Sequence, residues 1–304
     1  MSLSSGGPPA PAHPMVEATL WLDVSGKHCE GVVWDVRAGR LRFVDIPRGR
    51  VYQADTDSAD VSWEDLPPPV TAIHPTTEPA TLVVADGDGV ALAAHGRLVE
   101  RLAAPLAGRP EIRMNDANVD PDGRYFAGSM AYDMAPDAAC LYRLDADRSL
   151  HTVLTSVTIS NGIDWSPDAS LCYFVDSPLR RIDVFDYDRT SGTLARRRVF
   201  ADTSHLPGIP DGLTVDADGG VWVAFFGGGR VCRFTPDGRL DVTIGLPVSQ
   251  VTSCCFGGAQ LDELFISTST EGLSPVERRE QAGAGGIFRS RPGQHGRPGT
   301  EFRI

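Results

Sequence analysis

One segment occurs twice in the sequence, and it constrains the fold more than any other feature. The pattern Phe-Val-Asp, followed by a Pro-containing turn and an apolar residue, is found at residues 43–51 and again at residues 174–182, 131 residues further along. This separation corresponds to three units of about 44 residues. A period of 40–50 residues with several strands in each unit is typical of a β-propeller. The sequence therefore predicts a ring of repeated blades.

Short strand-like runs along the whole chain support this prediction. Runs rich in Val, Phe, Tyr and Trp alternate with Gly, Pro and Asp turns, and no 15-residue window has the apolar spacing of an amphipathic helix. The innermost strands are expected to start near Glu30, Glu78, Asn115, Asn161, Asp211 and Ser253. We therefore predict an all-β, six-bladed β-propeller.

The domain organisation is expected to be simple. Residues 1–15, rich in Pro, Ala and Gly, are predicted to form a flexible leader, and residues 16–290 a single propeller domain. The strand at residues 18–24 is expected to pair with the strand at 286–289, which closes the ring and removes exposed sheet edges. Residues 291–304 are predicted to be a loose polar tail.

Composition limits the classes of partner. The chain of 304 residues has 41% hydrophobic and 22% charged residues, a formal net charge of −12 and a pI near 5.0. This balance disfavours nucleic acid and anionic membrane surfaces, because both select clustered Lys and Arg. No apolar run is long enough to cross a bilayer. Six cysteines without a CxxC pair indicate free thiols in the cytoplasm, and we expect a monomer or a weak homo-oligomer.

Three polar residues share one register within the repeat. Asn161 and Asp211 each lie seven residues before an aspartate of a β-turn that leads into a strand. Glu30 precedes Phe43 by 13 residues, as Asn161 precedes Phe174. Equivalent positions of a propeller fall on one ring around the axis. Glu30, Asn161 and Asp211 are therefore predicted to meet in the central channel.

These three side chains would form a hard, all-oxygen ligand set. Two carboxylates and an amide carbonyl suit Ca²⁺, Mg²⁺ or Mn²⁺, and Zn²⁺ less specifically. Two carboxylates about 4 Å apart repel by roughly 4 kcal/mol at an effective dielectric constant near 20, and a divalent cation removes that penalty. We therefore expect one divalent cation in the channel. The alternative is that Asp211 and Asn161, each followed by glycine, are ordinary turn residues.

Arg113 and Asn115 are candidates for holding a ligand. They alternate with Met114, so both point to the same side of an extended strand, and their donors could bind hydroxyl or carboxyl oxygens. The alternative is an exposed Arg113 paired with a neighbouring acid. Asp116 is expected to face away from Asn115, and both Asp116 and Asn118 could equally cap a loop.

Five stretches of the chain resemble the SMP-30/gluconolactonase family. The stretches are residues 30–34, 113–130, 160–166, 210–216 and 253–258, and the similarity covers about residues 17–290. The resemblance implies a six-bladed propeller with one divalent cation in its central channel. It also implies hydrolysis of sugar lactones to aldonic acids.

The resemblance also implies roles for individual residues. Glu30, Asn161 and Asp211 match the family's metal-ligand positions, and Asp211 also matches the general acid/base. Arg113 and Asn115 match positions that contact the substrate.

Three residues depart from the family's pattern. Asp133 corresponds to a substrate-contacting position where the usual residue is Glu, and Ala117-Asn118 replaces the usual Gly-Lys. These differences concern the sugar rather than the metal.

The predicted metal site and the resemblance together imply metal-dependent hydrolysis of a gluconolactone-like sugar lactone. The cation would polarise the lactone carbonyl, and Asp211 would take the proton from the attacking water. Two alternatives stay open: the same site could act on phosphotriesters or other esters, or the chain could be a non-enzymatic calcium-binding regulatory protein.

Overall fold

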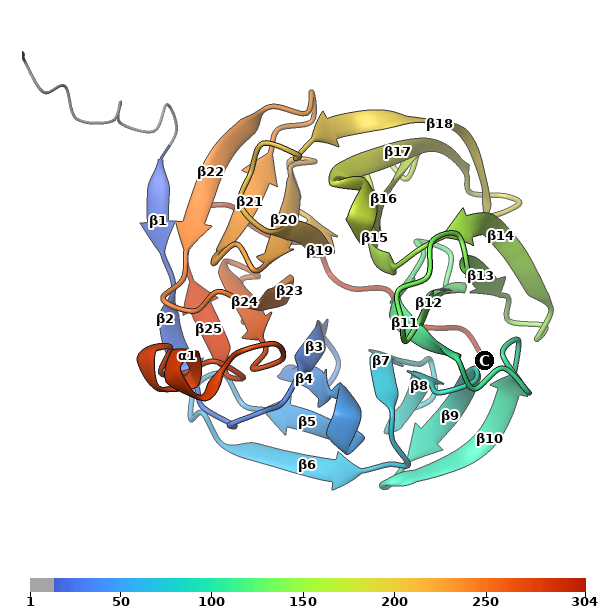
Figure 1. Cartoon of the computed structure of the whole chain (residues 1–304). Helices are drawn as coiled ribbons and strands as arrows, with labels where there is room; N and C mark the ends of the chain where they lie inside the picture. The colour runs from blue at the N-terminus through green and yellow to red at the C-terminus, as the bar shows by residue number, and fades with distance from the viewer. Residues whose placement is uncertain (1–13) are drawn as a thin grey trace, which may run out of the picture.

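Six antiparallel sheets stand around a central axis (Figure 1). The computed structural model describes residues 14–304, and the predicted all-β, six-bladed propeller is confirmed. The innermost strands are β3 (Cys29–Asp35), β7 (Val70–Pro75), β11 (Ile112–Val119), β15 (Ser160–Trp165), β19 (Ile209–Val215) and β23 (Val251–Gly257). Each of them contacts the innermost strands of the two neighbouring blades.

The remaining strands follow outward in chain order. The second strands are β4 (Arg40–Asp45), β8 (Thr81–Asp86), β12 (Tyr125–Ala131), β16 (Leu171–Asp176), β20 (Val221–Phe226) and β24 (Glu263–Thr268). The third strands are β5 (Arg50–Ala54), β9 (Val90–Ala94), β13 (Ala139–Leu144), β17 (Arg181–Asp188), β21 (Arg230–Phe234) and β25 (Ile287–Ser290). The outer strands of the first five blades are β6 (Val61–Asp65), β10 (Arg97–Ala103), β14 (Leu150–Val157), β18 (Thr193–Asp202) and β22 (Leu240–Gly245).

Helices are short. Two 3₁₀ segments cover Ile46–Arg48 and Ser177–Leu179, and α1 covers Pro275–Glu280. Within residues 14–304 no helix has the length and apolar character that crossing a membrane requires.

The N-terminal strand closes the ring. β2 (Thr19–Leu22) is the outer strand of the last blade and pairs antiparallel with β25, which confirms the predicted pairing. β1 (Met15–Glu17) adds a parallel edge strand to β22 of the fifth blade. Residues 1–13 of the predicted leader lie outside the described part of the chain.

The repeated Phe-Val-Asp pattern has a structural reason. Its aspartate ends the second strand of blades 1 and 4 and accepts hydrogen bonds from the backbone just before the innermost strand. Asp45 accepts from the N–H groups of Lys27 (3.0 Å) and His28 (3.1 Å). Asp176 accepts from those of Thr158 (3.1 Å) and Ile159 (2.9 Å). The same carboxylate therefore sets where the chain enters the centre of both blades.

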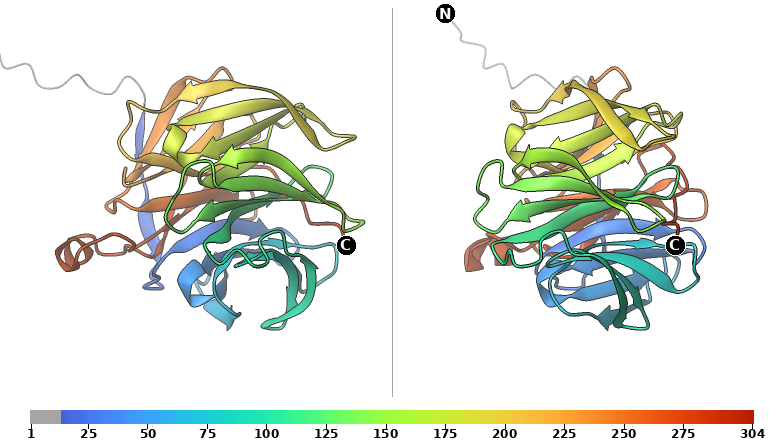
Figure 2. Two further views of the ribbon diagram at one scale, coloured as in Figure 1. Left: turned by 45° about the vertical axis from the view of Figure 1, so that its right-hand side comes forward. Right: turned by 90° about the vertical axis from the view of Figure 1, so that its right-hand side faces the viewer.

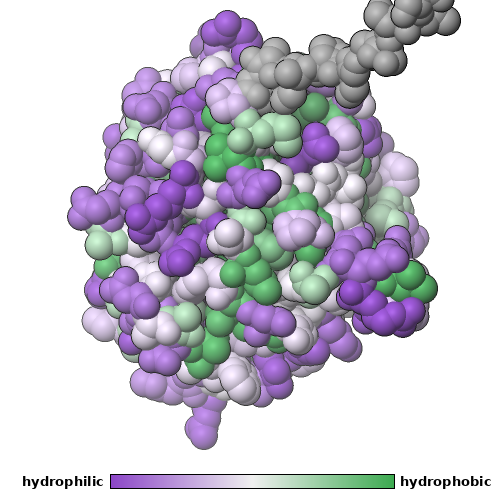
Figure 3. Space-filling view, turned by 90° about the vertical axis from the view of Figure 1, so that its left-hand side faces the viewer, coloured by the Kyte–Doolittle hydropathy of each residue, from purple (hydrophilic) through white to green (hydrophobic). Residues whose placement is uncertain are grey.

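Aromatic side chains fill the spaces between blades. The rings of Phe126 and Trp165 join blades 3 and 4 at 5.2 Å between centroids, and those of Trp222 and Phe256 join blades 5 and 6 at 5.6 Å. Solvent exposure increases outward: the innermost strand β7 is buried along its whole length, whereas the outer strand β6 is mostly exposed. The side of the molecule in Figure 3 shows hydrophobic residues as a narrow band among hydrophilic ones. The core thus lies between the blades rather than at the rim.

The predicted start of the second blade is wrong. Its innermost strand β7 runs from Val70 to Pro75, so Glu78 lies beyond it, in the turn that leads to β8. Thr76 holds this turn, because its hydroxyl lies 3.1 Å from the carbonyl oxygens of both Glu78 and Thr81.

The prediction of a loose C-terminal tail is also wrong. Residues 291–304 cross the end of the propeller opposite α1 (Figures 1 and 2). The Arg297 guanidinium donates to the carbonyl oxygens of Trp165 (2.7 Å) and Val215 (3.3 Å). The Phe302 side chain is 1% exposed and packs 6.0 Å from the Tyr125 ring. The polar composition of residues 291–304 gave no indication of these contacts.

Replacing Phe302 tests how firmly the tail is attached. Phe302→Ala should lower the free energy of unfolding by about 3–5 kcal/mol, the usual cost of emptying a buried phenylalanine site. Ile304→Ala, two residues further along at a side chain 42% exposed, should cost much less. Urea unfolding of the two variants measures both values. Equal, small effects would mean that the tail does not pack on the propeller.

Candidate metal centre

Four of the innermost strands present the candidate residues to the channel. Glu30 lies on β3, Asn161 on β15 and Asp211 on β19, while Arg113 and Asn115 lie on β11. In each strand the pairing register shifts at or beside the candidate residue. A β-bulge of this kind bends the strand and re-aims a side chain. The bulges therefore set the directions of the side chains at these positions.

Glycine follows three of these residues, and at two of them atoms of the next blade occupy the space that a side chain would need. A Cβ on Gly162 would lie 2.4 Å from the backbone nitrogen of Leu213, and one on Gly212 would lie 2.5 Å from Ser253 Oγ. Both are closer than real Cβ atoms come. The missing side chains thus let β15, β19 and β23 approach each other around the channel.

A chain of hydrogen bonds links the third and fourth blades. Arg113 Nη1 donates to Asn115 Oδ1 (2.7 Å), and Asn115 Nδ2 donates to Asn161 Oδ1 (2.8 Å) and to the carbonyl of Ser160 (2.8 Å). Asn161 Nδ2 in turn donates to Ser177 Oγ (2.7 Å). These bonds fix the Asn161 amide with its nitrogen toward Ser177, so its oxygen can serve as a ligand atom. Arg113 and Asn115, which were predicted to lie on the same side of the strand, thus contact each other.

Glu30 and Asp211 are buried acids, 5% and 7% exposed. Burial raises the pKa of Glu30 well above its usual value, and the charges of Asp211 and Asp116 raise it further. Burial and the charge of Asp116 likewise raise the pKa of Asp211, against the lowering effect of Arg113. Neither carboxylate forms an ion pair with an arginine, lysine or histidine of residues 14–304. The charge of Asp116 thus disfavours the ionised form of both acids, and the charge of Asp211 disfavours that of Glu30.

This donor set fits a divalent cation. Within residues 14–304, no three His, Cys, Asp or Glu side chains come together as a metal-binding group, so the set depends on the amide oxygen of Asn161. Two buried carboxylates without a cationic partner, together with one oriented carbonyl, provide the hard oxygen atoms that Ca²⁺, Mg²⁺ and Mn²⁺ prefer. Glu30, Asn161 and Asp211 are the residues that would hold the ion.

Asp116 is a functional candidate that the sequence reasoning missed. It occupies the position after Asn115 where three other inner strands carry glycine, and burial raises its pKa to about 6. Its charge acts on both Glu30 and Asp211. The shared register of Asn115-Asp116 with Asn161-Gly162 was the available signal. Asp116 lies within the β11 bulge, where the regular alternation of side chains along the strand is interrupted.

A cavity of about 630 Å³ opens at the α1 end of the channel. His28, Arg113, Tyr132 and Glu271 are among the residues that line it. The Arg113 guanidinium lies 5.9 Å from the Tyr132 ring centroid, and His28 Nδ1 lies 2.7 Å from a Glu271 oxygen. Asp133 is not in this lining: it is exposed, and its carboxylate accepts from the N–H of Ala135 (3.0 Å). The structure thus brings Arg113 to the cavity and leaves Asp133 on the rim.

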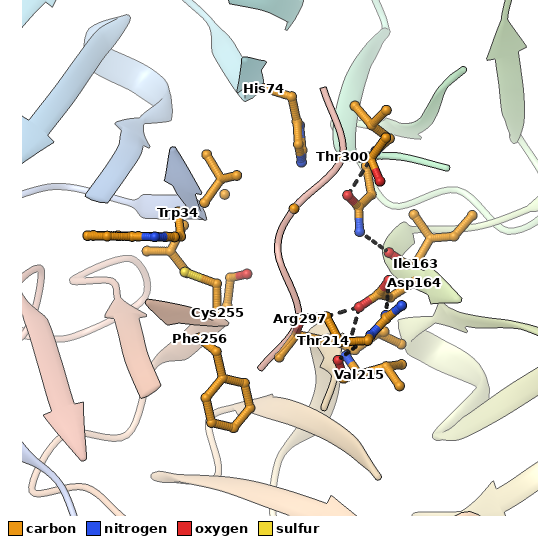
Figure 4. A pocket seen from close by; sticks show the side chains of 18 of the residues that line it. Trp34, His74, Ile163, Asp164, Thr214, Val215, Cys255, Phe256, Arg297 and Thr300 are labelled. Atoms are coloured by element: carbon orange, nitrogen blue, oxygen red, sulfur yellow. Dashed lines mark hydrogen bonds and ion pairs between the residues drawn. The ribbon is translucent and has the colours of Figure 1, made fainter. Parts of the chain in front are cut away.

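A smaller cavity of about 110 Å³ lies toward the other end. Figure 4 shows the C-terminal segment passing between His74 and Asp164, with Arg297 beside Asp164. Asp116 and His74 are among its lining residues, and His74 Nδ1 has no hydrogen-bond partner among the residues that the structure describes. Burial lowers the pKa of His74 to about 4, opposed by a hydrogen bond with Asn118.

Fold and site together define a propeller with an acidic oxygen site at its axis. A family model described as SMP-30/Gluconolactonase/LRE-like region matches residues 28–270. The chain is 36% identical to regucalcin of Oryctolagus cuniculus over 269 residues, which cover 86% of this chain and 90% of the relative. It is also 36% identical to regucalcin of Homo sapiens over 266 residues, with 86% and 89% covered. The chain belongs to the SMP-30/gluconolactonase family.

Solved structures share the fold. A regucalcin from Agrobacterium tumefaciens, described as a calcium-binding protein, has a TM-score of 0.90 at 23% identity and covers 95% of this chain and 99% of its own. A luciferin-regenerating enzyme has a TM-score of 0.87 at 27% identity, with 94% and 100% covered. A gluconolactonase from Xanthomonas campestris has a TM-score of 0.69 at 24% identity, with 88% and 86% covered.

The buried histidine should make the fold acid-sensitive. The pKa of His74 is about 4 in the folded chain and about 6.5 when unfolded, so the unfolded chain binds more protons between these values. Stability from this group is complete above pH 6.5 and is lost as the pH falls toward 4, by roughly 3 kcal/mol in all. In His74→Gln, the difference between the unfolding free energies at pH 7 and pH 4 should shrink by that amount. The exposed His205→Gln is the control, and identical pH profiles for both variants would contradict the prediction.

Removing one acid should have opposite effects with and without metal. Asp211→Asn relieves the repulsion with Glu30 and Asp116, so the chelator-treated variant should melt at a higher temperature than the wild type. Calcium at 100 times its dissociation constant should stabilise the wild type by about 2.7 kcal/mol and the variant by much less. Asp218→Asn removes an exposed charge seven residues away and should change neither value. A destabilised, chelator-treated Asp211→Asn would mean that the acids do not repel.

Proposed function

We propose that this chain hydrolyses a sugar lactone to the aldonic acid in the cavity above Glu30 and Asp211. One observation carries the proposal: Arg113 reaches from an open cavity of about 630 Å³ into the charge field of two buried carboxylates. Such a site offers both a binding group and a basic group to one small ligand. Membership of the SMP-30/gluconolactonase family and the fold shared with a gluconolactonase support the same reaction class. We place the reaction in the cytoplasm.

The proposed cofactor is one divalent cation, calcium, zinc, manganese or magnesium, held by Glu30, Asn161 and Asp211. When bound, the ion supplies Lewis acidity at the lactone carbonyl and offsets the negative charge of the two acids.

Asp211 is the proposed general acid/base. Its carboxylate takes a proton from the attacking water, whose oxygen forms a bond to the carbonyl carbon. The ring C–O bond then breaks, and the same proton passes from Asp211 to the ring oxygen, which becomes the hydroxyl of the aldonic acid. Burial of Asp211 favours its protonated form, which is the form needed for the second transfer.

Arg113 is proposed to orient the lactone. Its Nη1 is used by the carbonyl of Met114 and by Asn115, whereas Nε and Nη2 donate to no acceptor within residues 14–304. These free donors can hold sugar hydroxyls and then the product carboxylate. Asn115 holds both Arg113 and Asn161, so we assign it a positioning role beside its predicted contact with substrate. The contact predicted for Asp133 requires its side chain to leave the turn at Ala135.

A second function, calcium binding without turnover, is favoured by the relatives named regucalcin. This function and the proposed one are distinguished by one result: the chain would bind the cation but hydrolyse no lactone. Hydrolysis of phosphotriesters or other esters at the same site is the third outcome, and a comparison of rates on both substrate classes identifies it.

Turnover of glucono-1,5-lactone tests the proposal. The purified chain is treated with chelator, loaded with each of the four ions in turn, and followed by acid release above the uncatalysed rate. Asp211→Ala should lower kcat by about 10²–10⁴-fold, because a general base contributes that much. Asp218→Ala, the matched exposed aspartate, should keep the wild-type rate. Wild-type kcat in Asp211→Ala would exclude Asp211 as the base.

A further inference from the structure

Cations without a carboxylate partner gather at the mouth of the channel. Most arginines of the chain form ion pairs, as Arg42 does with Asp35 (2.8 Å) and Arg101 with Asp86 (2.7 Å). Three cations that line the cavity of about 630 Å³ do not pair with any acid of residues 14–304: Lys27, Arg113 and Arg278. The clustering is notable because the chain as a whole carries a formal charge of −12.

Lys27 is the only lysine in the sequence, since every other basic side chain is arginine or histidine. Its backbone N–H donates to Asp45 (3.0 Å), which fixes the main chain at the mouth. Its ammonium group has no hydrogen-bond acceptor among the residues that the structure describes, and the residue is exposed. A compact ammonium group on a flexible side chain, carried by a fixed backbone, is suited to binding an anionic group of a ligand.

The two arginines differ from Lys27 in being held. Arg113 is attached through Nη1 to Asn115, and its Nε and Nη2 donors have no acceptor within residues 14–304. Arg278 donates from Nε to the carbonyl of Leu273 (3.2 Å) and from Nη2 to that of Thr270 (3.2 Å). Neutral carbonyl oxygens do not cancel its charge. Both guanidinium groups therefore add positive potential to the same cavity.

One acid opposes these three cations in the cavity lining. Glu271 lies 2.7 Å from His28, and this hydrogen bond, more than the charge of Arg113, lowers the pKa of Glu271. The remaining lining is largely apolar or aromatic, including Pro69 and Tyr132. Lys27, Arg113 and Arg278 thus outnumber the acid, and the lining carries a net positive charge.

We propose that the mouth selects lactones that carry a second acidic group, a carboxylate or a phosphate, and that Lys27 is the main residue that holds this group. Arg278 adds to the attraction at the rim. The lactone ring then lies deeper, between Arg113 and Asp211. This inference rests on the proposed lactonase function and specifies its substrate class. A neutral sugar lactone would leave the Lys27 charge without a partner.

Competition between lactones tests the selection. The metal-loaded chain is assayed on glucono-1,5-lactone, which is neutral, on glucaro-1,4-lactone, which carries a carboxylate, and on 6-phosphoglucono-1,5-lactone. The kcat/KM on at least one acidic lactone should exceed that on the neutral one, and the arm with the higher value identifies the acidic group. Equal or lower values on both acidic lactones would overturn the proposal.

Substitutions separate the role of Lys27 from a general charge effect. Lys27→Gln should lower the acidic-to-neutral ratio of kcat/KM by about tenfold, as expected for one charge-assisted contact. Lys27→Arg should retain most of the ratio. Arg279→Gln removes a neighbouring exposed charge of α1 that is not part of the cavity lining, and it should leave the ratio unchanged. A ratio that falls equally in Lys27→Gln and Arg279→Gln would contradict a specific contact.

A binding readout keeps the inference testable without turnover. Because the sequence holds one ε-amine, acylation by an amine-reactive ester can be followed at Lys27 by peptide mass spectrometry. Glucarate should protect Lys27 at concentrations about tenfold lower than gluconate does. Protection without hydrolysis of any lactone would retain the anion site and reject the proposed function. Hydrolysis with equal protection by both acids would reject the anion site and retain the function.

Discussion

Closure of the ring by β2 on β25 is the constraint on which the site depends. Glu30 belongs to the first blade and Asp211 to the fifth, and β23 of the sixth blade contacts both of their strands. Without the N-terminal strand, this sixth blade would keep only three strands and an open edge. The charge of Asp211 raises the pKa of Glu30, so the two acids repel each other when both are ionised. The closed ring holds them together, so strand pairing at the rim opposes charge repulsion at the axis.

The sequence predicted most of the fold because the same stabilising contacts recur from blade to blade. Asp45 and Asp176 anchor the backbone ahead of the innermost strand in the same way, and this shared task produced the repeated pattern. The registers of Glu30, Asn161 and Asp211 followed from the same spacing. The second blade broke the rule, because its inner strand ends at Pro75 and Glu78 lies in a turn held by Thr76.

Two features could not be read from local pattern. Asp116 enters the acidic centre through a β-bulge, and a bulge depends on pairing with β12 rather than on the residues of β11 alone. The tail after β25 has a polar composition, but Phe302 and Arg297 contact partners on blades at least 82 residues away in the sequence. Both features arise from contacts between distant segments, which neither propensity nor periodicity encodes.

The tail that crosses the far end of the propeller limits the routes by which a solute can reach Asp211. A solute approaching Asp211 from that side would have to displace Arg297 from the carbonyls of Trp165 and Val215 and cross a space of about 110 Å³. The α1 side offers about 630 Å³ instead. In the proposed hydrolysis, lactone and product would therefore use the same opening, and the product would have to leave before the next lactone enters.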